Sequence, residues 1–271
     1  MDYQEPICPF DVSAYTGTPD AEPTGQHMDV PQRIRELDAI IHAGKTEEAL
    51  AFLHRSREEA AEMGDWRAEL SMLSEMMGQY RYVNRPQQGL QAVQEGMALI
   101  REHHLGQTVS GATVMLNAAT TLKHFGRAAE ALPIFRHVSR IYADNLDPTD
   151  YRFGGLYNNM ALACVDLEDA QGAEQYFRMA LNVLAKGQHT ENDMAVTWCN
   201  LAELYDRMDP LDERVGECVE RAWDLLNMPE LPQDGYHSIS IEKCLPCFDY
   251  FGYFYYVKEL RERVARIRGG A

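Results

Sequence analysis

One pattern of residues recurs at near-constant spacing along this chain and constrains its fold more than any other feature. In each copy, apolar and small residues of one helix precede an aromatic or β-branched residue on the next helix. The clearest copy contains Tyr157, Met160, Ala161 and Cys164, followed by Phe177 and Ala180. The steps from Met115 to Tyr157 and from Tyr157 to Trp198 are 42 and 41 residues. A period of this length predicts a solenoid of stacked helical hairpins, because each hairpin buries its second face only against a neighbour.

The helices and their ends follow the same period. The apolar residues of the first helix repeat at steps of three and four residues: Ile34, Leu37, Ile40 and Ile41. This spacing places them on one buried face. Gly44, Asn84 and Gly126 occupy equivalent places after helices, and Gly and Asn tolerate the left-handed conformation that ends a helix. We therefore expect an array of about five to six hairpins over residues 31–268.

Small residues recur where the two helices of a hairpin should cross closely. Ala119, Ala161 and Ala202 hold this position in three successive copies. A larger side chain there would force the helices apart, at a cost of roughly 1–3 kcal/mol.

These residues resemble the tetratricopeptide repeat, whose usual period is ~34 residues. The longer period here, with GGLYNNMALACVDL followed by GAEQYFRMALNVL, is similar to the repeats of kinesin light chains and their bacterial relatives. The resemblance covers roughly residues 31–268. It implies an all-α, right-handed α-solenoid, in which the first helices of successive hairpins line a concave groove for an extended peptide or a partner helix.

Transferring this groove onto the chain gives a set of candidate partner-binding residues. They are Arg81, Asn117, Thr120, Lys123, Asn158, Asn159, Asn200 and Glu203. An amide donates and accepts hydrogen bonds, so Asn117, Asn159 and Asn200 could pair with a peptide backbone. The alternative is that these amides bond between helices. The family's chaperone-binding clamp needs several basic groove residues, and this groove is basic early and acidic late, which disfavours that ligand.

The net charge excludes some classes of partner. The chain has 25 basic and 42 acidic side chains, for a formal net charge of −17. Nucleic acid and anionic membranes are therefore unfavourable partners. No stretch approaches the ~20 apolar residues of a membrane helix, and the N-terminal sequence lacks the features of a secretory signal. We expect a cytoplasmic protein.

Residues 1–30 differ in composition from the rest of the chain. They include six acids and four prolines but no Lys or Arg. This composition predicts an extended or mobile acidic tail. Ile7, Cys8 and Phe10 are the apolar residues that could attach it to the first hairpin.

Cys244 and Cys247 form a Cys-x-x-Cys pair that allows three interpretations. A redox site expects a strand–helix setting, and a zinc site needs two further ligands, for which His237 and Cys8 are the candidates. The repeat register instead places both cysteines at core positions of a first helix, together with Phe248 and Phe251. We favour the core interpretation and expect no metal or cofactor.

Seven aromatic residues fall within residues 248–256, in a terminal hairpin that we expect from about residue 236. No single helix face can hide all of them. The segment is interpreted either as a cap on the last hairpin or as a contact surface, including one for a second copy of the chain. Residues 258–268 that follow carry a net charge of +3.

The sequence contains no Ser-His-Asp set, phosphate loop or zinc-protease motif, so we expect no catalytic residues. The resulting prediction is a non-catalytic scaffold or adaptor that binds a protein or peptide. The alternatives are a regulator that responds to a peptide or small ligand and, less favoured, a metal or redox protein built on Cys244 and Cys247.

Overall fold

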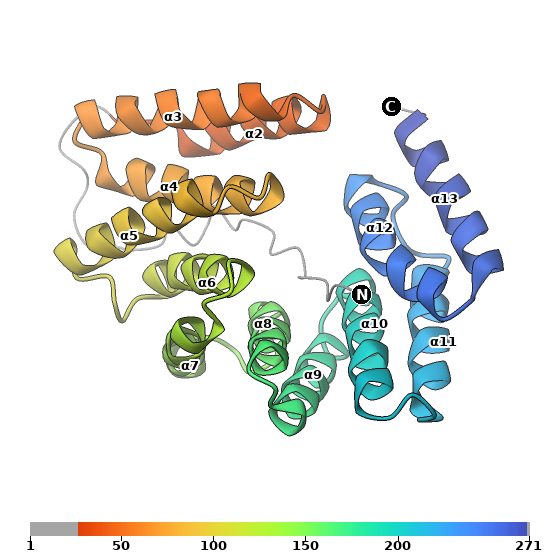
Figure 1. The fold of residues 1–271 in the computed structure, drawn as a ribbon. Coiled ribbons are helices and arrows are strands. Elements are labelled where there is room, and N and C mark those ends of the chain that lie inside the picture. Colours follow the sequence, from red (N-terminus) through yellow and green to blue (C-terminus); the bar gives the residue numbers. More distant parts are fainter. Residues whose placement is uncertain (1–26, 270–271) are drawn as a thin grey trace. The chain divides into compact units, whose positions relative to one another are not determined.

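The computed structural model describes residues 27–269, which form α-helices without any β-strand (Figure 1). The predicted all-α fold is confirmed. The helices are α2 (Val30–His42), α3 (Thr46–Glu62), α4 (Trp66–Tyr82), α5 (Pro86–Glu102), α6 (Val109–His124), α7 (Ala128–Asn145), α8 (Arg152–Asp166), α9 (Ala170–Leu184), α10 (Glu191–Met208), α11 (Arg214–Leu226), α12 (Gly235–Tyr250) and α13 (Phe254–Gly269).

The described chain divides into two compact units. The N-terminal unit contains α2 to α7, and the C-terminal unit starts at Leu146 and contains α8 to α13. Each unit is built of three helical hairpins. The first helices α4, α8 and α10 each pack on the second helix of their own hairpin and on the first helix of the next, whereas α2 packs on α3. The repeat pattern predicted the hairpins but not this division.

The turns inside the hairpins use left-handed backbone at the predicted places. Gly44, Asn84 and Gly126 have φ of 70°, 52° and 76°. The fourth hairpin turns through Glu168 at φ 60°, a conformation that is unfavourable for a residue with a Cβ atom. The fifth turn is different, because α10 ends at Asp209 in extended backbone.

The close crossings are buried as the alanine pattern predicts. Ala119, Ala161 and Ala202 are fully buried, and so are Phe135 and Phe177 beside them. These positions leave no room for longer side chains. Hairpin packing is therefore tight in both units.

The described part of the expected tail packs against helices. Met28 is buried against Ala60 and Ala68, and its backbone N–H donates to the Asp65 carboxylate at 3.1 Å. Helix α2 starts at Val30, where Asp29 caps it through the backbone N–H of Gln32. The expectation for residues 1–26, including Cys8 and Phe10, lies outside the described residues.

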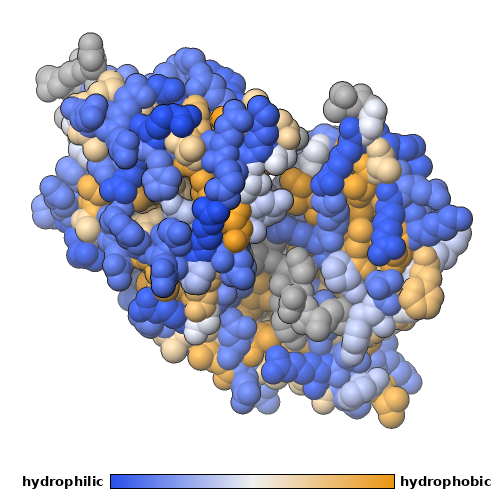
Figure 2. All heavy atoms as spheres, turned by 45° about the horizontal axis from the view of Figure 1, so that its top comes forward, coloured by the Kyte–Doolittle hydropathy of each residue, from blue (hydrophilic) through white to orange (hydrophobic). Residues whose placement is uncertain are grey.

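No helix among residues 27–269 is long and apolar enough to cross a membrane. On the face drawn in Figure 2, hydrophilic side chains predominate and hydrophobic ones are scattered between them. The exposed large apolar residues with the highest exposed fractions include Tyr82, Leu211, Phe254 and Tyr255.

Candidate functional site

In the N-terminal unit, the predicted groove residues connect α4 to α6. The Asn117 amide donates to Ser74 Oγ at 2.7 Å. The Arg81 guanidinium donates to Thr121 Oγ1 at 2.7 Å and to the Asn117 carbonyl at 3.4 Å. Both side chains thus bridge consecutive first helices.

The other two predicted residues of this unit lie on α6. Thr120 is buried and donates its hydroxyl to the Leu116 carbonyl of its own helix at 2.9 Å. Lys123 is 8% exposed. The structure therefore brings Arg81 and Asn117 together, while Thr120 bonds within its own helix.

In the C-terminal unit, the predicted residues lie on α8 and α10. The Asn200 amide donates to Asn158 Oδ1 at 3.3 Å, and both side chains are fully buried. Asn159 donates to the Gly155 carbonyl of its own helix at 3.0 Å. Glu203 lies one turn after Asn200 and is 5% exposed. Asn117 and Asn200 thus bond between helices, which was the alternative to pairing with a peptide backbone. Asn159 bonds within its own helix.

Two amide atoms of α8 are left without a hydrogen bond. Asn158 Nδ2 and Asn159 Oδ1 are buried and have no partner in the described residues. Leaving such a group unsatisfied costs about 1–3 kcal/mol. In native proteins such a group usually has a partner outside the chain, such as a bound water or a ligand.

Glu75 on α4 is a further first-helix residue, and it was absent from the predicted set of groove residues. It holds the same repeat position as Asn117, Asn159 and Asn200, so the spacing of the repeats could have identified it. Burial raises the pKa of the Glu75 carboxyl to about 7; Asp38 adds to this shift and Arg81 opposes it. The carboxyl therefore carries a proton over part of the physiological pH range.

Polar bonds also join α10 to α12. The Tyr236 hydroxyl donates to Asp193 Oδ1 at 2.8 Å, and burial raises the pKa of Asp193 to about 6. His237 is fully buried and its Nδ1 lies 2.8 Å from Asn192 Oδ1, so Nδ1 carries the proton. Burial lowers the pKa of His237, which keeps the ring neutral.

The Cys-x-x-Cys pair lies in the core, as its register predicts. Cys199, Cys244 and Cys247 are at most 1% exposed, and Phe248 is fully buried. Burial raises the pKa of the Cys199 thiol well above its usual range. Within residues 27–269, no group of three or more His, Cys, Asp or Glu side chains is arranged to hold a metal ion. Cys199 is therefore held as a thiol, the weakly nucleophilic form.

The aromatic C-terminal segment is part cap and part open surface. The Tyr256 ring stacks on Trp223 with centroids 3.7 Å apart, and Phe248 meets Trp223 edge-on. Tyr250, Phe254 and Tyr255 are instead 59%, 67% and 72% exposed. Some of the seven rings thus cap the last hairpin, and a contact surface formed by the exposed ones stays a prediction.

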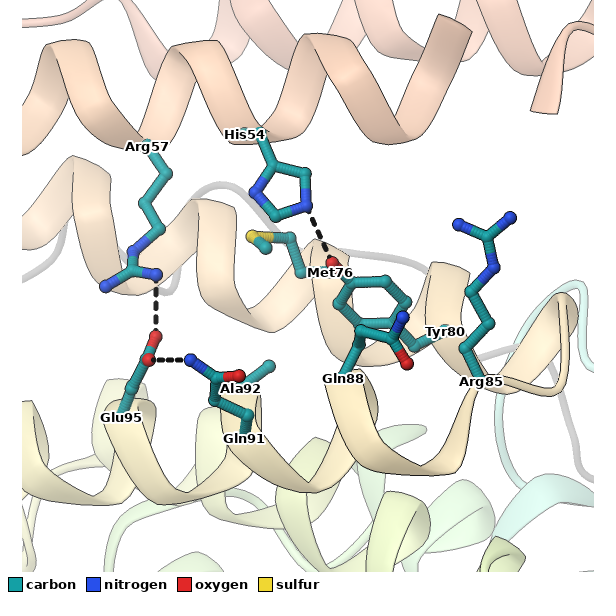
Figure 3. A pocket seen from close by; sticks show the side chains of 9 residues that line it. All are labelled: His54, Arg57, Met76, Tyr80, Arg85, Gln88, Gln91, Ala92 and Glu95. Carbon is teal, nitrogen blue, oxygen red and sulfur yellow. Dashed lines mark hydrogen bonds and ion pairs between the residues drawn. The ribbon is translucent and has the colours of Figure 1, made fainter. Parts of the chain in front are cut away.

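A small polar cavity of about 150 Å³ lies between α3, α4 and α5 (Figure 3). The Tyr80 hydroxyl is 2.8 Å from His54 Nε2 at its floor. Arg57 pairs with Glu95 at 2.6 Å and with Glu69 at 3.1 Å, so its charge is compensated. The cavity presents no activated nucleophile. In the C-terminal unit, Tyr205 holds the repeat position of Tyr80, and the Arg214 guanidinium lies 3.8 Å from the centroid of its ring.

Comparison with known proteins identifies the fold. No protein-family model and no curated protein sequence matches the chain. Among solved structures, BtubC (BKLC) from P. vanneervenii aligns with a TM-score of 0.56 at 20% identity, over 83% of this chain and 91% of that one. A putative kinesin light chain from Podosopora anserina, with nearly identical TPR-like repeats, aligns with a TM-score of 0.53 at 16% identity, over 74% and 95%. The fold is that of a tetratricopeptide-repeat protein.

The predicted resemblance is thereby confirmed at the level of the fold. In this TPR-like fold, the bridging residues Arg81, Asn117 and Asn200 lie on first helices of hairpins. The identities of 16% and 20% show no more than the architecture. A partner-binding role of these helices does not follow from the fold alone.

Proposed function

We propose that this TPR-like protein is a non-catalytic scaffold that binds a polypeptide on the first helices of its hairpins. The observation that carries the proposal is the pair of unsatisfied amide atoms on α8, Asn158 Nδ2 and Asn159 Oδ1. Both atoms are buried in the unbound protein, so binding requires the side chains that cover them to move aside. One is a donor and the other an acceptor, the two groups that an extended polypeptide backbone complements at each residue.

The remaining features agree with this function. The TPR-like fold suggests protein interaction, and the acidic net charge of −17 favours a protein partner over nucleic acid or an anionic membrane. The thiol cluster and the polar cavity offer no activated nucleophile. We place the protein in the cytoplasm and assign it no cofactor.

The test uses Asn158→Ala beside Asn182→Ala. Asn182 is an exposed amide on α9 of the same hairpin and serves as the matched control. Polypeptides retained by the wild-type protein from a lysate are identified by mass spectrometry, and the affinity of each purified one is then measured for all three proteins. We expect Asn158→Ala to weaken binding about 3- to 10-fold, the effect of one lost hydrogen bond, and Asn182→Ala to leave it unchanged.

Equal affinity of the three proteins for every retained polypeptide would contradict the proposed site. Asn158 accepts a hydrogen bond from Asn200 on α10, as Arg81 donates one to Thr121 on α6, so the fold of the Asn158→Ala protein has to be checked beside its affinity. Circular dichroism of each variant separates a binding defect from a loss of structure.

A further inference from the structure

The last helix of the chain exposes positive charge that the fold does not use. Arg263 donates to the Leu226 carbonyl at 2.6 Å, and Arg268 pairs with Glu242 at 2.6 Å. Within residues 27–269, the remaining cations of α13, namely Lys258, Arg261 and Arg266, are exposed and form no ion pair. In a chain of net charge −17, such a cluster favours an acidic partner.

The same helix also exposes apolar surface. Phe254, Lys258, Arg261 and Ala265 follow one another at helical steps of four, three and four residues and therefore form one stripe along α13. Phe254 at its start is 67% exposed, and the neighbouring Tyr255 is 72% exposed. A terminal repeat of a solenoid usually has a polar outer face that prevents further stacking. α13 combines exposed polar side chains with the exposed rings of Phe254 and Tyr255 at its start.

The first hairpin has a surface of opposite charge on α3. Glu48, Ala51, Arg55, Glu58 and Glu62 follow one another at helical steps of three and four residues and are all exposed. Glu58 and Glu62 form no ion pair in the described part of the chain, and Glu48 pairs only with the adjacent Lys45 at 3.1 Å. Ala51 and Ala265 are the small residues of the two stripes, which allows two helices to approach each other.

We propose that copies of this chain associate head to tail, with the basic α13 stripe of one copy docked on the acidic α3 stripe of the next. The interface joins two different surfaces and is therefore heterologous, so that association continues beyond a dimer unless a ring closes. It uses a surface separate from the proposed polypeptide-binding residues. Because exposed ion pairs are individually weak, the association is weak and sensitive to salt.

The experiment exchanges the charges of the two stripes. One variant carries Lys258→Glu and Arg261→Glu of the α13 stripe together with Arg266→Glu, the exposed cation beside the stripe. The other carries Glu48→Lys, Glu58→Lys and Glu62→Lys. The control reverses three exposed cations elsewhere, with Arg136→Glu, Arg140→Glu and Lys186→Glu. Sedimentation velocity over a range of concentrations, at low and high NaCl, reports the mass of the full-length protein.

We expect wild type and control to associate with increasing concentration at low salt and to dissociate at high salt. Each stripe variant alone should associate at least about tenfold more weakly, and an equimolar mixture of the two should regain association, because opposite charges then face each other again.

Three results would overturn the proposal. The first is a wild-type protein that stays monomeric at every concentration. The second is loss of association in the α13 variant but not in the α3 variant, which indicates a symmetric dimer of the C-terminal segment. The third is binding of monomeric wild type, but not of the α13 variant, to phosphatidylserine vesicles, which assigns the cations to a lipid surface.

Discussion

At the scale of single residues, Glu75 makes stability depend on pH in a defined direction. Burial raises its pKa to about 7 in the folded protein, against 4.5 for a glutamate carboxyl exposed to water. Between these values the folded state binds a proton that the unfolded state has lost, so Glu75 makes the free energy of unfolding fall as pH rises. Above pH 7, the folded protein bears the cost of a buried carboxylate.

We therefore expect Glu75→Gln to be more stable than wild type at pH 8, by at most about 3 kcal/mol, and to match it near pH 5. Urea unfolding at the two pH values measures the difference. Glu58→Gln on the exposed face of α3 is the control and should track wild type at both. A Glu75→Gln protein that loses stability equally at both values would indicate that the side chain acts by packing alone.

At the scale of helices, two adjacent glycines of α8 have opposite environments. A Cβ atom on Gly154 would lie 2.4 Å from Leu184 Cδ2, whereas one on Gly155 would have no atom within 4 Å. Alanine lowers the conformational entropy of the unfolded chain and suits a helix, but it needs space in the folded state.

Gly155→Ala should accordingly raise the unfolding free energy by about 0.5–1 kcal/mol, and Gly154→Ala should lower it by about 1–3 kcal/mol. Chemical denaturation of the two variants beside wild type gives both values. Changes of the same sign in the two would show that helix propensity or packing alone governs α8.

At the scale of the whole molecule, stability should be distributed unevenly along the array. In the N-terminal unit, α6 packs on α4, α5 and α7, whereas α2 packs chiefly on α3. In repeat proteins, each hairpin is stabilised mainly by its neighbours. We expect hydrogen exchange, followed by mass spectrometry, to deprotect α2 before α6. Equal protection of the two helices would show that the array opens as a single unit.

The sequence predicted the helices, their ends and the buried alanines, because these follow from local periodicity. It predicted the positions of Asn117 and Asn200 but could not decide what they bond, since the acceptors Ser74 and Asn158 lie about 42 residues away. The cavity beside Tyr80 was missed for a related reason. It depends on the lengths of side chains from three helices, which no pattern within one helix reveals.

The asparagine bonds also bear on how such a chain can change in evolution. Asn117 and Asn200 each bond the residue one position earlier in the preceding hairpin, Ser74 and Asn158. For Asn159 that residue is Leu116, whose side chain has no acceptor, and the two units divide between these hairpins. The hairpins are therefore not interchangeable modules. Duplicating or exchanging one would separate each amide from its acceptor, so recombination is expected to preserve hairpins in neighbouring pairs.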